Sequence, residues 1–253
     1  MDSPDSDAVR AWLTNWQESV LTTLQSVDPA AVFVADLWSH KSGGGGLTRA
    51  CPGGDILEKA GVNFSDVRGT SLPPAATATR PELAGKSFRA MGVSIVIHPR
   101  NPHCPTSHAN TRFITIGNDD APDCWWFGGG WDLTPSYGYV EDAVEWHRAA
   151  LASCAPFGKH LYPKYKEVCD RYFYLPHRGE TRGIGGLFFD DFTEGGFGGE
   201  VWRANHLQKA VAFLERAIFG QVASCLAHEP DGRPVTGLPR AGGEKSFARS
   251  HLV

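Results

Sequence analysis

Three residues at alternate positions of one short segment, His108, Asn110 and Arg112, combine side chains suited to binding and proton transfer. In an extended chain such residues lie on one face. The planar guanidinium group of Arg112 suits a carboxylate held by two hydrogen bonds, and an imidazole exchanges protons near neutral pH. The pattern predicts a site for an acidic ligand. The alternative for Arg112 is a structural ion pair with one of the 28 acidic residues, and the pattern favours neither.

Four histidines stand in the central part of the chain, namely His98, His108, His147 and His177. Histidine is the commonest metal ligand as well as the usual general acid or base. Their spacing allows a shared site, and equally four separate residues that are hydrogen-bonded within the fold.

Two acidic positions follow glycine-rich or apolar sequence. Asp132 follows the glycines at 128–130, where the backbone can approach a ligand closely and a carboxylate can accept N–H donors. The alternative is a turn, or a cap for a helix that begins near Val140. Asp190 and Asp191 follow Leu-Phe-Phe; they could form a carboxylate pair, but turn and capping roles are the favoured interpretation.

The hydrophobic periodicity predicts helices at residues 6–27, 140–154, 163–174 and 202–226. Ser6 or Asp7 is the expected cap of the first helix. Strands are expected at residues 91–98, 108–117, 124–127 and 184–189, the third ending at the glycines. Ser94 should share a face with Val96 and His98, opposite Val93, Ile95 and Ile97. Because strands occur in a run without regular alternation with helices, the prediction is an α+β domain with an antiparallel sheet.

Two other segments are predicted to be irregular. Residues 43–46 are four glycines, which favour a hairpin turn over a loop that approaches an anion, and residues 66–88 read as a long loop rich in Pro, Ala, Thr and Arg. In the predicted helix at 140–154, the stripe formed by Val140, Val144, His147 and Leu151 should place His147 inward.

The composition is that of an ordinary globular protein. Of its 253 residues 42% are hydrophobic and 21% are charged, with a net charge of −4. The chain has no basic run, so nucleic acid is not expected as a partner, and no apolar window long enough to span a membrane. The acidic N-terminus is unlike a signal or transit peptide, so we expect a cytoplasmic protein. The six cysteines show no C-x-x-C spacing and are expected to be small buried residues rather than zinc ligands.

These segments together resemble the oxygen-dependent coproporphyrinogen III oxidase family. The resemblance runs from about residue 8 to about residue 195. Its most specific block is His98-Pro-Arg-Asn-Pro-His-Cys-Pro-Thr-Ser-His-Ala-Asn-Thr-Arg112. The matching segments are residues 43–49, 58–65, 92–112 (which includes this block), 125–135 and 176–191.

The resemblance implies a large flat antiparallel sheet flanked by helices on both faces, in a single domain at residues 1–229 that forms a homodimer. It implies oxidative decarboxylation of two propionates of coproporphyrinogen III to vinyl groups, which gives protoporphyrinogen IX. Molecular oxygen is the co-substrate, no organic cofactor is required, and a bound metal is doubtful.

The resemblance also assigns roles to residues. Ser94, Asn110, Thr111 and Arg112 match substrate contacts, and His108 matches the proposed proton donor. Asp132 matches a carboxylate that faces the pyrrole N–H groups. His98, His108, His147 and His177 match a proposed metal set.

The last part of the chain departs from this family. Members continue into strands with Arg-Gly-Arg-Tyr, Asp-Arg-Gly and Gly-Gly-Arg segments, whereas residues 230–253 match none of them and are expected to be a poorly ordered tail. Two further hypotheses therefore stand beside the oxidase. One is a non-catalytic paralogue that binds a porphyrinogen or a partner subunit, and the other is a metal-dependent enzyme that uses the four histidines.

Overall fold

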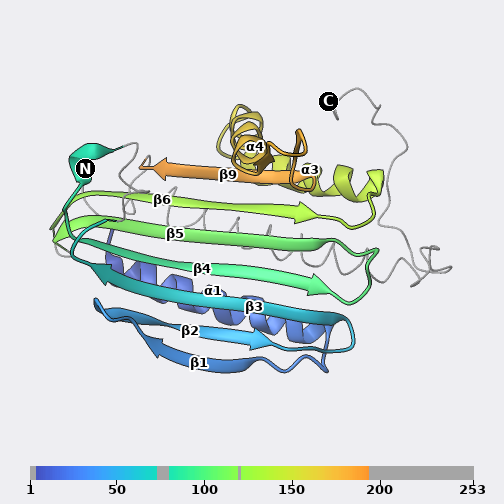
Figure 1. The fold of residues 1–253 in the computed structure, drawn as a ribbon, viewed down its shortest axis with the longest axis horizontal. Helices are drawn as coiled ribbons and strands as arrows, with labels where there is room; N and C mark the ends of the chain where they lie inside the picture. The colour runs from blue at the N-terminus through green and yellow to red at the C-terminus, as the bar shows by residue number, and fades with distance from the viewer. Residues whose placement is uncertain (1–3, 73–79, 119–120, 194–253) are drawn as a thin grey trace.

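The structure, a computed structural model, describes residues 4–72, 80–118 and 121–193. Its centre is a seven-stranded antiparallel sheet in the order β1-β2-β3-β4-β5-β6-β9 (Figure 1). The strands are β1 (Val34–Ser39), β2 (Gly44–Cys51), β3 (Leu57–Gly69), β4 (Phe88–Pro99), β5 (Thr106–Asn118), β6 (Ala121–Thr134) and β9 (Gly185–Phe192). Helices α1 (Ser6–Val27), α3 (Val140–Cys154) and α4 (Leu161–Tyr172) accompany it, with a short 3-10 turn (Pro81–Leu83) and a small hairpin, β7 (Tyr174–Leu175) and β8 (Glu180–Thr181). The α+β prediction with an antiparallel sheet is confirmed.

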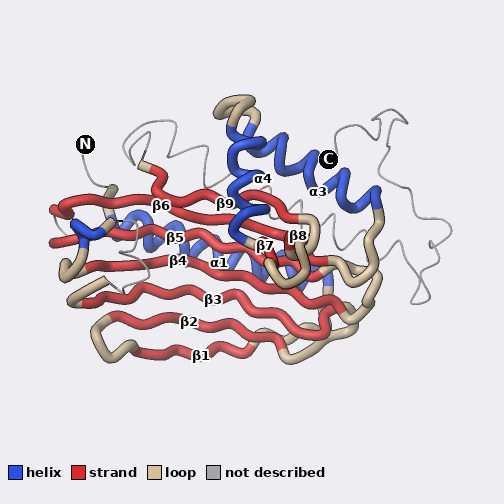
Figure 2. Tube along the Cα trace, turned by 45° about the horizontal axis from the view of Figure 1, so that its top comes forward, coloured by secondary structure: helices blue, strands red, loops and turns tan. Residues whose placement is uncertain are grey.

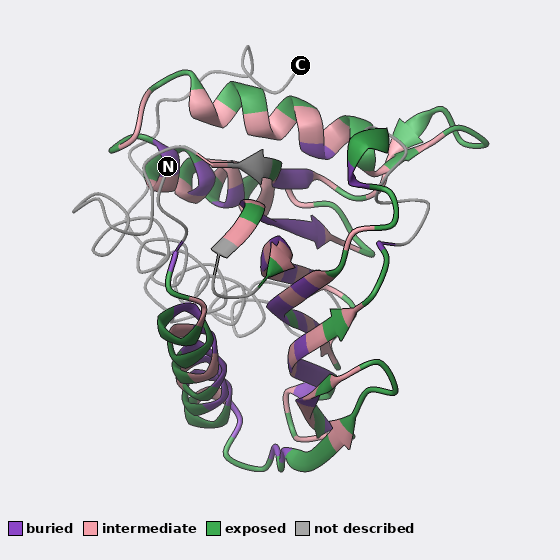
Figure 3. Ribbon diagram, turned by 90° about the vertical axis from the view of Figure 1, so that its left-hand side faces the viewer, coloured by how far each residue is buried: buried purple, intermediate pink, exposed green. Residues whose placement is uncertain are grey.

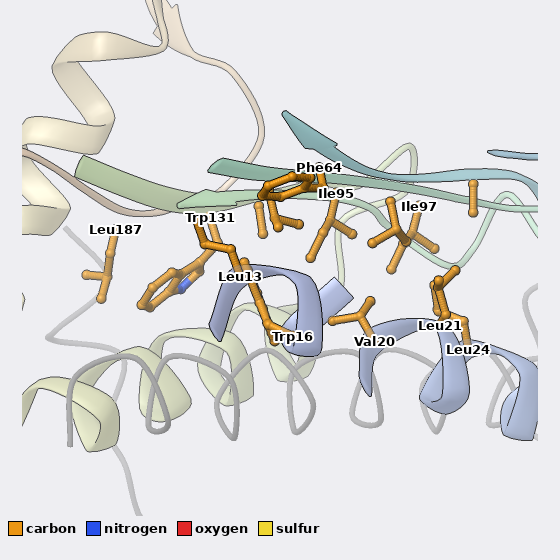
Figure 4. Packing of buried hydrophobic residues seen from close by; sticks show 14 of the residues in the cluster. Leu13, Trp16, Val20, Leu21, Leu24, Phe64, Ile95, Ile97, Trp131 and Leu187 are labelled. Carbon is orange, nitrogen blue, oxygen red and sulfur yellow. The ribbon is translucent and has the colours of Figure 1, made fainter. Parts of the chain in front are cut away.

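Helix α1 covers one face of the sheet. Its apolar residues, among them Val9, Leu13 and Leu24, are buried toward the strands, and its other side is exposed (Figure 3). Leu13, Trp16 and Val20 meet Phe64, Ile95 and Trp131 in one core, which Figure 4 shows from close by. The helix is capped by Asp5, whose carboxylate accepts from the backbone N–H of Asp7 and Ala8, rather than by Ser6 or Asp7 as predicted.

Helix α4 crosses the sheet at β9. Its first residues, Leu161, Tyr162 and Tyr165, pack against the core that α1 shares. At its other end Tyr172 stacks on Phe188 of β9, with ring centroids 4.2 Å apart. Figure 2 shows this helix passing over β9, while α1 lies behind the sheet. The end of α4 therefore reaches the face that α1 leaves open.

Several local predictions are corrected. The third strand does not end at the glycines: β6 continues through residues 128–130 to Thr134. Part of the predicted loop at 66–88 is strand, because β3 runs to Gly69 and β4 begins at Phe88. Asp66 can lie in that strand because Arg89 of β4 satisfies both of its oxygens at 2.8 Å, in a buried ion pair.

The stripe predicted for α3 is confirmed at His147, which faces inward toward Ile184 and Tyr162, but it is wrong at two of its apolar residues. Val140 and Leu151 are exposed, and the buried residues of this helix are Trp146, Ala150 and Cys154. Helix α4 lies two residues earlier than predicted. Gly43 lies in the turn between β1 and β2, and Gly44 is the first residue of β2; both have positive φ. Gly45 and Gly46 also belong to β2, so the hairpin is confirmed, but most of the glycine run lies in its second strand. The predicted helix at 202–226 and the tail at 230–253 lie outside the described residues.

Among the helices that the structure describes, none is long and apolar enough to cross a membrane. Of the cysteines described as free, Cys51, Cys154 and Cys169 are buried, as expected, and Cys124 is half-buried. Burial raises the pKa of the Cys169 thiol to about 12, with smaller contributions from Asp132 and Asp170. This thiol therefore stays protonated and packs as a small apolar group.

Candidate functional site

The register of the central strands brings the predicted site residues to one face. Asn110 of β5 pairs with Ser94 of β4 and with Gly130 of β6, and His108 pairs with Asp132. Residues that are directly paired lie on the same face of a sheet. Ser94, His108, Asn110, Arg112 and Asp132 therefore share the face opposite α1.

Thr111 lies on the other face. It pairs with Val93, which belongs to the core under α1. The alternation of side chains along β5 thus separates it from its neighbours Asn110 and Arg112. The structure does not bring the side chain of Thr111 to the site that the resemblance implied.

A chain of three polar residues occupies one part of this face. His108 Nδ1 lies 3.0 Å from Asp132 Oδ1, and Arg182 Nη2 donates to Asp132 Oδ2 at 2.7 Å. The Asp132 side chain is only 2% exposed, whereas His108 is 31% and Arg182 is 41% exposed. A buried carboxylate thus holds two partly exposed groups. The turn or helix cap that stood as the alternative for Asp132 is excluded, because this residue lies within β6.

Arg182 was not singled out by the sequence analysis, although it stands in the matching segment 176–191. It follows the β7–β8 hairpin, and its guanidinium group lies 4.0 Å above the ring of Phe173. Its Nε is buried and has no hydrogen-bond acceptor within the described residues. The signal available was its residue type beside three glycines, but only the fold shows that it meets Asp132.

Arg112 forms the second polar group of the face. Its Nη1 donates to Asn110 Oδ1 at 3.0 Å and its Nη2 to Asp190 Oδ2 at 2.9 Å. The guanidinium carbon lies 5.4 Å from the ring centroid of Phe188. The structural ion pair that the sequence allowed is therefore present, and Asp190 belongs to β9 rather than to a turn. Since Arg112 is still 29% exposed, its remaining N–H donors can reach a ligand.

Glycines make this arrangement possible. Gly128 of β6 pairs with Arg112, and a Cβ at Gly128 would lie 2.7 Å from Arg112 Nε. The guanidinium group therefore lies across Gly128 on its way to Asp190. The glycines at 128–130 therefore do not end β6, and Gly128 leaves the space that the Arg112 side chain occupies.

The four histidines of the predicted metal set are not brought together. His98 lies near Thr106, 3.4 Å from its hydroxyl, on the same face as His108. His147 bonds through Nε2 to the carbonyl of Ile184 and through Nδ1 to the hydroxyl of Tyr162, and His177 lies between β7 and β8. In the described ranges no three His, Cys, Asp or Glu residues lie close enough to hold a metal ion.

The buried environment of His147 favours the neutral form of its ring. Burial lowers the pKa of His147 below its ordinary value, and the Ile184 carbonyl only partly opposes this shift. The neutral ring donates from Nε2 to the carbonyl and accepts at Nδ1 from Tyr162. Both nitrogens are thus occupied within the fold, so these residues do not fit a four-histidine metal centre.

The sequence model described as coproporphyrinogen III oxidase matches residues 8–225. The chain belongs to this family. The match continues beyond residue 195, where the resemblance was expected to end. Membership supports a coproporphyrinogen oxidase-type enzyme of porphyrin biosynthesis, with coproporphyrinogen as the substrate that the family implies.

Proposed function

We propose that the chain oxidatively decarboxylates two propionates of coproporphyrinogen III with molecular oxygen, giving protoporphyrinogen IX. For each propionate, the C–H bond on the carbon next to the pyrrole and the bond to the carboxyl carbon are broken, and a vinyl C=C bond forms. The carboxyl group leaves as CO2. Two electrons and two protons pass to O2, giving H2O2, so no organic cofactor is required.

The observation that carries the proposal is the pair of partly exposed arginines on one glycine-lined face. Arg112 and Arg182 are each anchored by a single aspartate, Asp190 and Asp132 respectively. A guanidinium group has five N–H donors, so each arginine retains donors for a second carboxylate. A substrate with four propionates suits two such positions, and Ser94 and Asn110 add neutral polar contacts beside them.

His108 is the group that we propose to transfer a proton. Asp132, as a carboxylate, can only accept, so the ring hydrogen on Nδ1 is directed to it and Nε2 is left for the substrate. A carboxylate in this position fixes the tautomer and stabilises the imidazolium form. Because Asp132 is nearly inaccessible, we propose that it acts by positioning His108 and Arg182. The resemblance had placed it against the pyrrole N–H groups.

The test is turnover. Purified protein is incubated with coproporphyrinogen III in air and without oxygen, and protoporphyrin fluorescence is read after chemical oxidation of the products. The proposal expects product in air only, with H2O2 formed in proportion. Binding without product in air would instead support the non-catalytic paralogue, and equal product without oxygen would exclude O2 as the oxidant.

The resemblance also leads us to propose a homodimer, in the cytoplasm. Sedimentation equilibrium of the whole chain tests the first part. A single species with the mass of two chains is expected, and a species with the mass of one chain across the concentration range would contradict it.

A further inference from the structure

On the face opposite α1, strands β3 and β4 lie next to Arg112 and carry mostly small side chains. We call this part of the face the floor. Four small residues, Gly61, Ser65, Gly92 and Ser94, lie on this face together with the larger Val96. Ser65 pairs with Gly92 and Gly61 pairs with Val96, and all of them alternate with core residues. Such small side chains leave the backbone close to any ligand above it. One larger polar residue, Asn63, stands in the middle of this floor.

On the β9 side of the site, aromatic side chains occupy the same face of the sheet. There Phe188 is covered by the stacked ring of Tyr172, and Arg112 leans toward Phe188. A ring whose propionate is held by Arg112 therefore finds room over β4 and β3 and not over β9.

Asn63 has an unsatisfied polar atom. Its Oδ1 is buried and accepts no hydrogen bond from the part of the chain that the structure describes. Buried polar atoms are nearly always paired, and leaving one unpaired costs about 1–3 kcal/mol. Asn63 is also in register with the predicted contacts, because it pairs with Ser94, which pairs with Asn110.

We propose that Asn63 is a further substrate-contacting residue, whose side-chain oxygen accepts a hydrogen bond from a pyrrole N–H of the bound porphyrinogen. This inference rests on the proposed function. Two strand intervals separate Asn63 from Asn110, about 10 Å. A single small carboxylate does not bridge that span. A tetrapyrrole with one propionate bound to Arg112 is large enough to cover this distance, and it places pyrrole N–H donors above Asn63.

The test compares two isosteric variants, Asn63→Asp and Asn63→Leu, in the whole protein. Coproporphyrinogen III is equilibrated with each protein by dialysis without oxygen, so that binding is measured apart from turnover, and is then oxidised and read by fluorescence. Asn118→Leu, an asparagine at the far end of β5, is the matched control. Thermal unfolding of each variant shows whether it folds, and Asn63→Ser replaces Asn63→Leu if the latter does not.

The inference expects Asn63→Leu to raise the Kd by about ten-fold, the value of one lost hydrogen bond. Asn63→Asp, which keeps the acceptor, should bind better than Asn63→Leu, and the control should bind like the wild type. Wild-type affinity in Asn63→Leu would overturn the inference, and so would weaker binding by Asn63→Asp than by Asn63→Leu, because that order would place a propionate there. Failure of wild-type turnover with these binding effects intact would overturn the proposed function alone.

Discussion

Replacing Asp132 by Asn should invert the hydrogen bonding of His108 with little change in shape. The asparagine amide can satisfy both neighbours in one way only, with its oxygen accepting from Arg182 and its NH2 donating to Nδ1 of His108. The ring hydrogen then moves to Nε2, and the charge that stabilises the imidazolium form is lost. The fold should persist because every polar group keeps a partner.

The expected fall in kcat follows from the contribution of proton transfer to catalysis. General acid–base catalysis contributes about 10²–10⁴-fold, so kcat should fall by that factor, which is about 3–5 kcal/mol of transition-state stabilisation. The free energy of unfolding should change by only about 1 kcal/mol, the net value of one hydrogen bond. Binding of coproporphyrinogen III should change much less than kcat.

The assay combines turnover in air with nitrogen NMR of the labelled His108 ring, which reports the tautomer directly. Asp123→Asn is the matched control, since Asp123 forms an exposed ion pair with Lys86. A kcat within ten-fold of the wild type, together with an unchanged His108 tautomer, would refute the reasoning about Asp132.

Three further predictions follow from individual contacts. Arg112→Ala should weaken binding of coproporphyrinogen III by about 2–4 kcal/mol, as when one partner of a charge pair is removed. The control Arg171→Ala, in an exposed ion pair, should bind like the wild type. An Arg112→Ala affinity equal to that of the wild type would show that Arg112 has a structural role only. Gly128→Ala should displace Arg112 and raise KM while the protein stays folded by circular dichroism, and an unchanged KM would contradict the close approach. Asp28→Ala should lower the free energy of unfolding by about 1–3 kcal/mol at neutral pH, because its carboxylate accepts from three backbone N–H groups. Burial raises the pKa of Asp28, but the backbone hydrogen bonds lower it by more, so the pKa lies below its ordinary value. The contribution of Asp28 to the free energy of unfolding is therefore present above the unfolded-state pKa and is lost as the pH falls through the folded-state pKa. Denaturant unfolding at neutral and acidic pH should show the variant and the wild type converging in acid, and a constant difference would exclude this account.

The sequence predicted the elements whose periodicity is strong and local. Helix α1 was predicted with its correct ends, and β4 and β5 were predicted with the correct alternation of faces. Ser94 and His98 could therefore be placed on one face of their strand, and His108, Asn110 and Arg112 on one face of the next. That the two sets share one face of the sheet followed only from the strand register in the structure.

The failures concern residues whose partners are distant in sequence. Gly128 looked like the end of a strand because glycine weakens strands in isolation, yet it lies under the guanidinium of Arg112. Asp66 looked like loop sequence because its partner, Arg89, is in another strand. Asp190 was interpreted as a turn or capping residue, since capping is a common local use of aspartate. Its actual partner, Arg112, lies in another strand.

The central claim is that the open face of β4–β6 binds the porphyrinogen, and a crystal structure of the protein with coproporphyrin III, the stable oxidised form of the ligand, tests it most directly. We predict that the macrocycle lies on the face opposite α1, with one propionate on Arg112 beside Asn110. A ligand bound on the α1 side of the sheet, or away from Arg112 altogether, would contradict the account.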